Sequence, residues 1–365
     1  MKHILFFSIV FFVSQTGCQE NQSKKVPNLQ QKALHFRNDF TAYNLNYFTD
    51  SLKNEFISFA DFVTAKKIHF HTIDGKQKWS IDLKQLMDSE KEKFIYYHVV
   101  SPDSILLLSK YSNRIYLINQ KAEVLKKLDY SRLLMEGIEF VPPIYVQGNT
   151  VFHAFNNYPV KQLTTQEEQL NWELESFGKN CIAQTSLKDE SQTPEYIGQN
   201  LFNRFIKRNE ILADGVHFYL NQSKIYYHSA YSDTIYSITK DQIRPLFKVQ
   251  SEIGKIFLKP STRSEYVKNT NCINEAYLKQ AFITSLLFDN RRNLIYVLVR
   301  KPQVGEHFPF NVLVYDQAFK KRDEFQFDGT QHHPNGFIGK KGLYLLRNYD
   351  KTPNQKSFDL LTYEN

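Results

Sequence analysis

The feature that most constrains the fold is a group of four short apolar segments between residues 94 and 130. These segments are rich in aromatic and β-branched residues, and Pro-Asp, Ser-Asn and Gln-Lys-Ala separate them. The pattern predicts four short antiparallel strands, which is the usual content of one β-propeller blade. A second copy follows, because Ile105–Ile118 aligns without a gap on Ile225–Ile238. We therefore predict an all-β chain built from repeated blades.

Six such groups can be placed along the chain, with a period of roughly 50 residues. We expect the blades at about 55–83, 94–130, 142–187, 215–250, 281–328 and 335–364. The last group is short of strands, so we expect a strand within residues 32–50 to complete it and close the ring. A pair of β-sandwiches or another multi-sheet β fold is the alternative, but the grouping of strands in fours favours the propeller.

Two stretches interrupt this pattern. Leu163, Leu170 and Leu174 have helical spacing within residues 160–180, which predicts a helical insertion in a loop on one face of the domain. Residues 251–280 are polar with scattered apolar positions and form a second expected insertion. A shorter loop, residues 303–309, lies inside the fifth blade.

The N-terminal residues have the composition of a targeting segment. Lys2 precedes an apolar stretch at residues 4–13, which is too short to span a membrane, and Gly17 precedes Cys18. This arrangement resembles a bacterial lipoprotein cleavage site, so we expect residues 1–17 to be removed and Cys18 to carry lipid. An ordinary secretory signal is the alternative, and both export the protein. Residues 18–31 are polar and predict a flexible tether, followed by the propeller domain at 32–365.

The net charge bears on the possible partners, and the two remaining cysteines bear on a possible disulfide. The net charge is +8, but the lysines are spread along the chain and no basic stripe with interleaved aromatics occurs, so we expect no nucleic-acid partner. An exported protein can oxidise Cys181 and Cys272 to a disulfide, and two separate buried thiols are the equal alternative.

The segment Asp103–Val124 resembles a known family. Its Asp-Ser-Ile before a strand and its Ile-x-Leu-Ile-Asn before a turn are similar to those of uncharacterised Bacteroidetes lipoprotein propellers, the family of domain of unknown function 4221. Asn119 is followed here by Gln-Lys-Ala, where the family usually has Gly. The resemblance implies a lipid-anchored propeller and brings no catalytic residues.

Several histidines could take part in metal binding. His98, His217 and His228 lie on predicted strands, and they would form a metal site only if they converged at the channel. The alternative is that each is a half-buried strand residue with a hydrogen bond. His332 and His333 are expected in a loop, where adjacent side chains cannot easily bind one ion together.

The acids next to predicted turns are candidates for a central calcium site. They are Asp103, Asp214, Asp233, Asp289 and Asp350, accompanied by Asn113, Asn221, Asn290 and Asn335. The alternative is turn chemistry, since Asp and Asn hydrogen-bond their own backbone. The equivalent positions of Tyr111-Ser112-Asn113 and Tyr231-Ser232-Asp233 favour this structural role.

No sequence signature of nucleophilic catalysis or phosphate binding occurs. We therefore assign no catalytic, cofactor-binding or metal-binding residue. The leading hypothesis is a lipid-anchored binding or scaffold module of the outer membrane, periplasmic or surface-facing, that presents its face and insertions to a protein, peptide or glycan. The alternatives are a metal-dependent hydrolase or lactonase that uses the channel, and a purely structural envelope component.

Overall fold

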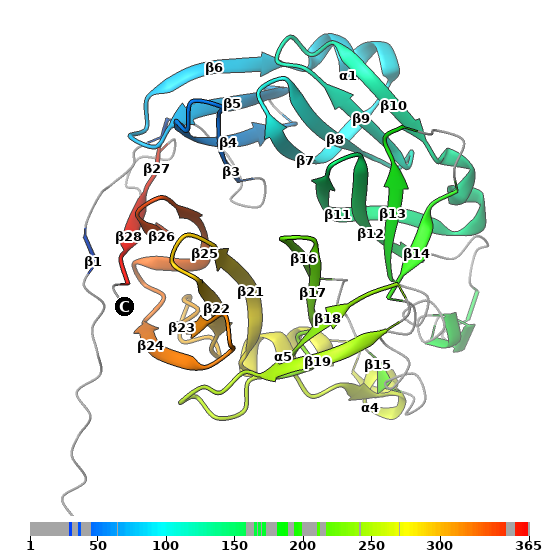
Figure 1. Ribbon diagram of the computed structural model, residues 1–365. Coiled ribbons are helices and arrows are strands. Elements are labelled where there is room, and N and C mark those ends of the chain that lie inside the picture. The colour runs from blue at the N-terminus through cyan, green and yellow to red at the C-terminus, as the bar shows by residue number, and fades with distance from the viewer. Residues whose placement is uncertain are drawn as a thin grey trace, which may run out of the picture.

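A computed structural model describes residues 29–30, 36–37, 45–63, 65–157, 164–165, 167–168, 170–172, 181–188, 193–198, 210–211, 217–240, 242–269, 271–347 and 355–363. Six antiparallel sheets of four strands each surround a common axis in these residues (Figure 1). The fold is therefore a β-propeller, and the prediction of six four-stranded blades is confirmed. The predicted signal peptide and Cys18 lie outside the described residues.

The first three blades come from the N-terminal half of the chain. Blade 1 contains β3 (Asn46–Thr49), β4 (Glu55–Asp61), β5 (Lys67–Thr72) and β6 (Gln77–Asp82). Blade 2 contains β7 (Lys93–Ser101), β8 (Ser104–Lys110), β9 (Arg114–Ile118) and β10 (Val124–Asp129). Blade 3 contains β11 (Ile138–Gln147), β12 (Thr150–Asn157), β13 (Cys181–Ser186) and β14 (Glu195–Ile197).

The other three blades follow the same up-and-down order. Blade 4 contains β16 (His217–Asn221), β17 (Lys224–His228), β18 (Thr234–Ile238) and β19 (Ile243–Lys248). Blade 5 contains β21 (Phe282–Asp289), β22 (Leu294–Arg300), β23 (Phe310–Asp316) and β24 (Lys321–Phe327). Blade 6 contains β25 (His332–Gly339), β26 (Gly342–Arg347), β28 (Phe358–Leu361) and β1 (Leu29–Gln30).

Short elements lie between the blades. The helical ones are α1 (Lys84–Glu90), the 3-10 turn η2 (Ser131–Glu136), α4 (Arg263–Lys268) and α5 (Cys272–Lys279). Two small ladders pair β2 (Phe36–Arg37) with β27 (Gln355–Lys356) and β15 (Glu210–Ile211) with β20 (Ser261–Thr262). The first strand of every blade borders the axis, as Figure 1 shows for β3, β7, β11, β16, β21 and β25.

The ring is closed by the N-terminal part of the chain, as predicted. Leu29 and Gln30 pair with Leu361 and Leu360, which makes β1 the outermost strand of blade 6. The position differs from the prediction, because β1 lies in the segment assigned to the tether. Residues 46–49, which fall inside the expected closing segment, form the innermost strand of blade 1 instead. A strand of two residues is too short to show alternating hydrophobicity, so the sequence pattern could not locate it.

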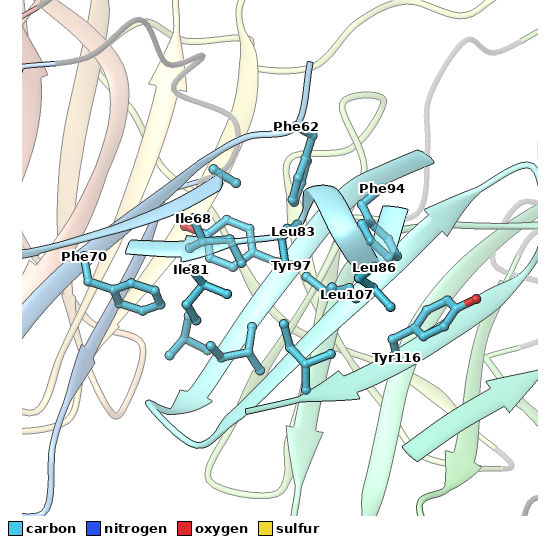
Figure 2. Packing of buried hydrophobic residues seen from close by; sticks show 14 of the residues in the cluster. Phe62, Ile68, Phe70, Ile81, Leu83, Leu86, Phe94, Tyr97, Leu107 and Tyr116 are labelled. Atoms are coloured by element: carbon cyan, nitrogen blue, oxygen red, sulfur yellow. The ribbon is translucent and has the colours of Figure 1, made fainter. Parts of the chain in front are cut away.

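The cores lie between neighbouring blades, because each sheet buries both of its faces against the next. Figure 2 shows the junction of blades 1 and 2, where Phe70, Tyr97 and Leu107 are fully buried. Leu86 of α1 closes one end of this cluster. The Tyr97 hydroxyl donates to Ser58 Oγ at 3.1 Å, so the polar end of this buried ring is satisfied.

The duplicated Tyr-Ser turns have the structural role that their equivalence predicts. Each turn joins the second and third strands of its blade, and the backbone oxygen of its last residue accepts a hydrogen bond from the end of the outer strand. Tyr130 N donates to Asn113 O at 3.2 Å, and Val249 N donates to Asp233 O at 2.7 Å. The repeat therefore ties the outer strand to the middle of the sheet in blades 2 and 4.

Candidate functional site

Most of the long connections of the propeller lie on one face. In a four-stranded up-and-down blade, the loops after the first and third strands leave one face, and the other loops leave the opposite face. The first set consists mostly of tight turns, such as residues 148–149 and 222–223, with the connection from β13 to β14 as the longer exception, and we call that side the turn face. The second set includes α1, η2, the described residues between β12 and β13, between β14 and β16 and between β19 and β21, and the loop 301–309, and we call that side the insertion face.

The two predicted insertions pack against each other on the insertion face. Leu170, in the short helical stretch of the first insertion, is 1% exposed and contacts Tyr266 and Ile273 of the second. Arg263 Nη2 lies 3.4 Å from Glu167 Oε1 across the same boundary. We call this assembly the cap; it consists of residues 167–172, β15, β20, α4 and α5.

The cap is attached to blade 5 through α5. Gln303 N donates to Leu278 O at 2.8 Å, and the rings of Tyr277 and Phe282 meet edge to face at 5.2 Å. The Arg300 guanidinium donates to Tyr277 O and lies 3.8 Å from the centre of the Phe308 ring. The loop 301–309 is therefore held between the cap and the propeller.

Two cavities open on the insertion face. One, of about 410 Å³, lies within the cap and is lined mainly by charged and amide side chains, including Lys259, Glu265, Lys268, Glu275, Lys279 and Gln280. The other, of about 520 Å³, lies between the loop 301–309 and the end of blade 5, with Lys301, His307, Gln326, Phe327, Asp328 and Thr330 in its wall. The hydroxyl and backbone of Thr330 lower the pKa of Asp328, so this carboxylate stays ionised at neutral pH.

A third group of polar side chains lies next to the axis, where the inner strands of blades 2 and 3 meet. Tyr96 and His98 are two residues apart on β7, and Tyr145 belongs to β11. The rings of His98 and Tyr145 meet edge to face with centroids 5.7 Å apart. We call Tyr96, His98 and Tyr145 the axial trio; all three are half-buried.

The axial trio is uncharged at neutral pH. Burial lowers the pKa of His98 to about 4 and raises the pKa of Tyr96 to about 12. Burial also raises the pKa of Tyr145, and the neighbouring phenols of Tyr96 and Tyr219 add to this rise. The trio therefore offers neutral hydroxyl and imidazole groups on aromatic walls.

The predicted histidine candidates do not come together. His98 belongs to blade 2, whereas His217 and His228 stack on each other in blade 4 with ring centroids 5.2 Å apart. His228 is buried with Nε2 3.2 Å from Ile283 O, as the structural interpretation expected, but His217 is exposed. His332 lies in a strand rather than a loop, where Nε2 is 2.9 Å from Asp359 Oδ2.

The acidic candidates are also dispersed. Asp103 and Asp289 lie on the turn face, and Asp289 pairs with Arg292 at 2.6 Å. Asp233 lies on the insertion face and pairs with Lys248 at 3.0 Å. Asp214 and Asp350 fall outside the described residues. Within the described ranges, no group of three or more His, Cys, Asp or Glu side chains is close enough to hold a metal ion.

The two cysteines of the domain are free thiols. Cys181 is buried between blades 2 and 3, which raises the pKa of its thiol to about 12. Cys272 begins α5 in the cap, is half-buried, and lies with Sγ 3.2 Å from Ser261 Oγ. The disulfide alternative is therefore not formed in this structure, and the two thiols occupy different elements.

Sequence reasoning missed Tyr96 and Tyr145 as site residues. The signal that could have found them is an aromatic or imidazole side chain on the first strand of a blade, since this strand always borders the axis. The cavity-lining residues carry no comparable signal, because the contact between insertions far apart in the sequence creates their arrangement.

The fold is similar to those of several solved structures, although no family model and no curated protein matches the sequence. A member of the domain of unknown function 4221 family from Bacteroides vulgatus has a TM-score of 0.71 and 16% identity, over 94% of this chain and 99% of that one. The predicted resemblance to this family is therefore confirmed as a likeness of fold. A protein of Bacteroides fragilis classed as exported has a TM-score of 0.47 and 9% identity, over 93% and 98% of the two chains. A calcium-binding regucalcin from Agrobacterium tumefaciens has a TM-score of 0.42 and 12% identity, over 87% and 89%.

Proposed function

We propose that this chain is a binding module of the cell envelope that recognises its ligand with the insertion face. The observation that carries this proposal is the packing of separate insertions into one cap on the insertion face. A propeller needs none of these insertions to close its ring, so their packing into one surface points to recognition. The two cavities give this surface the concave shape that ligand sites usually have.

The proposal includes export and attachment to the outer membrane through a lipid on Cys18. The apolar segment at residues 4–13 followed by Gly17 and Cys18 supports it. In the described part of the chain, no helix has the length and hydrophobicity needed to cross a bilayer. Replacing Cys18 with Ser should abolish labelling of the protein by a radioactive fatty acid in growing cells and release it from the membrane fraction. Unchanged labelling would contradict the lipid attachment.

The face used for binding can be tested by charge reversal on an array of envelope glycans, peptides and proteins. One variant carries Lys268→Glu and Lys279→Glu, which change exposed side chains of the cap. The matched control carries Lys121→Glu and Lys224→Glu, two exposed lysines on the opposite face, one in a turn and one at the start of β17. We expect the cap variant to lose binding at least tenfold and the control to keep it. Equal binding by both variants, or a blank array, would contradict the proposal.

A further inference from the structure

We propose that the axial trio, Tyr96, His98 and Tyr145, binds one sugar unit of an uncharged carbohydrate at the propeller axis. The inference builds on the proposed function, for which it supplies a ligand class. It places a second contact point away from the cap, so the two can be tested separately.

The three side chains share one position in the fold. Tyr96 and His98 are two residues apart on one strand, so both point to the same side of β7. That side faces blade 3, as the contact between His98 and Tyr145 at 5.7 Å shows. Tyr145 also meets Phe218 of blade 4 edge to face at 5.3 Å, so apolar packing fixes its ring. Two adjacent inner strands thus bring three polar ends to one place beside the axis.

The polar ends of the trio find no partner in the described part of the chain. Within the described residues, the Tyr96 hydroxyl, the His98 ring and the Tyr145 hydroxyl form no hydrogen bond, and none of these atoms is fully sealed from solvent. Their neighbour Tyr97 shows the usual behaviour, since its hydroxyl donates to Ser58. A half-buried phenol or imidazole normally finds a partner. Here the partner comes from outside the protein, as water that a hydroxylated ligand can replace.

The chemical groups of the trio also restrict the class of ligand. A phenol both donates and accepts, and a neutral imidazole has one donor and one acceptor. Sugar hydroxyls also donate and accept, and the aromatic walls suit the apolar faces of a sugar ring. A charged ligand would lose its hydration without gaining a counter-charge from these three groups, which is costly. The trio therefore favours a neutral polyhydroxyl molecule.

The test is calorimetric titration of the whole chain with glucose, galactose, mannose, N-acetylglucosamine and their neutral oligomers, beside glucuronate as the charged counterpart. We expect at least one neutral sugar to bind and glucuronate to bind at least tenfold more weakly than glucose or its oligomers. Tyr96→Phe and Tyr145→Phe remove only a hydroxyl and keep the ring, and each should weaken binding about tenfold. Tyr111→Phe, which changes a tyrosine that is 62% exposed in the turn between β8 and β9, should leave the affinity unchanged.

Three results would overturn the proposal: no sugar binds, glucuronate binds as tightly as glucose, or the Tyr96→Phe and Tyr145→Phe double variant keeps full affinity. Ring-labelled tyrosine in the unaltered chain gives a second measurement that does not depend on folded variants. Its Tyr96 and Tyr145 resonances should shift when the sugar is added, and unshifted resonances would also overturn the proposal. The Lys268→Glu and Lys279→Glu variant should still bind the sugar, which separates failure of this site from failure of the insertion face.

Discussion

Individual buried polar residues decide how this propeller responds to acid. His153 on β12 is fully buried in the core between blades 2 and 3, where its ring lies 4.0 Å from the ring of Phe140. Burial lowers the pKa of His153 from 6.5 to about 3, so the unfolded chain binds a proton at this residue at a higher pH than the folded protein does. The free energy of unfolding must therefore fall as the pH drops below 6.5.

His153→Leu should reduce this dependence on pH. Each histidine that is neutral in the fold and protonated in the unfolded chain contributes a slope of about 1.4 kcal/mol per pH unit. We expect the variant to lose about this much slope between the folded and unfolded pKa values, measured by urea unfolding at several pH values. Leu52→Ala, at an exposed residue that does not titrate, should keep the slope of the unaltered protein. An unchanged slope in His153→Leu would show that His153 does not titrate as inferred.

Glu92 shows how a buried charge is accommodated in blade 2. Burial alone would raise its pKa, but hydrogen bonds from Ser109, Arg114, Ser112 and Tyr116 outweigh this and lower it. The Arg114 guanidinium lies 2.7 Å from the Glu92 carboxylate, whose side chain is 4% exposed. Arg114 is therefore the only cationic partner of Glu92 among the described residues.

Arg114→Gln should be strongly destabilising because it leaves the Glu92 carboxylate buried without its cation. We expect a loss of about 3 kcal/mol or more in the free energy of unfolding. Lys67→Gln, which breaks a more exposed pair with Asp82 at 3.7 Å, should cost less than about 1 kcal/mol. Similar losses in both variants, measured by denaturant unfolding, would contradict this account.

At the scale of elements, a single turn residue can hold two neighbouring blades together. Asn113 is buried, has a φ of 50°, and uses its side chain to bind the first strand of the next blade. Its Nδ2 donates to Ile138 O at 2.7 Å, and its Oδ1 accepts from Phe140 N at 2.8 Å. One turn residue thus fixes the junction between blades 2 and 3.

Asn113→Ala should weaken this junction through two effects. It removes two buried hydrogen bonds and places a less tolerant residue in the left-handed region, which together should cost about 2–4 kcal/mol. Asn221→Ala, at the end of β16, removes an exposed hydrogen bond that Asn290 donates, and it should cost under about 1 kcal/mol. Thermal unfolding of the two variants gives the comparison. An Asn113→Ala melting temperature equal to that of the control would contradict the proposed role.

The blades were predictable from the sequence because they depend on local patterns. Strands such as Leu294–Arg300 are continuous apolar runs between turn residues, and this pattern can be recognised from the sequence alone. The closing strand Leu29–Gln30 is too short to show a pattern. A strand within residues 32–50 was predicted, but its place as the innermost strand of blade 1 depends on how the ring closes. Tyr96 and Tyr145 were missed for a different reason, since only the ring brings them together with His98.

At the scale of the whole molecule, the cap joins parts of the chain that the propeller alone would leave separate. Leu170, Tyr266 and Ile273 form its small apolar centre, and the ladder of β15 with β20 adds backbone pairing. Few buried contacts hold it compared with the cores between blades, so we expect it to open more readily than the ring.

Leu170→Ala tests this independence. It should speed hydrogen exchange of the amides in α4 and α5, while the melting temperature of the propeller changes by no more than about 2 °C. Leu52→Ala, at a residue that is 81% exposed, should change neither quantity. Unaltered exchange in α4 and α5 would mean that Leu170 does not hold the cap in place.

The pairing of β1 with β28 also sets the order in which the blades can be completed. In the sequence, β1 precedes the strands of the other five blades, and its partner β28 follows them. The first blades can form while the chain is still emerging, but β1 has no neighbour to pair with until β28 has been made. Blade 6 is therefore completed only after the other five blades have been synthesised, and until then the nascent propeller keeps the open edges of an incomplete ring.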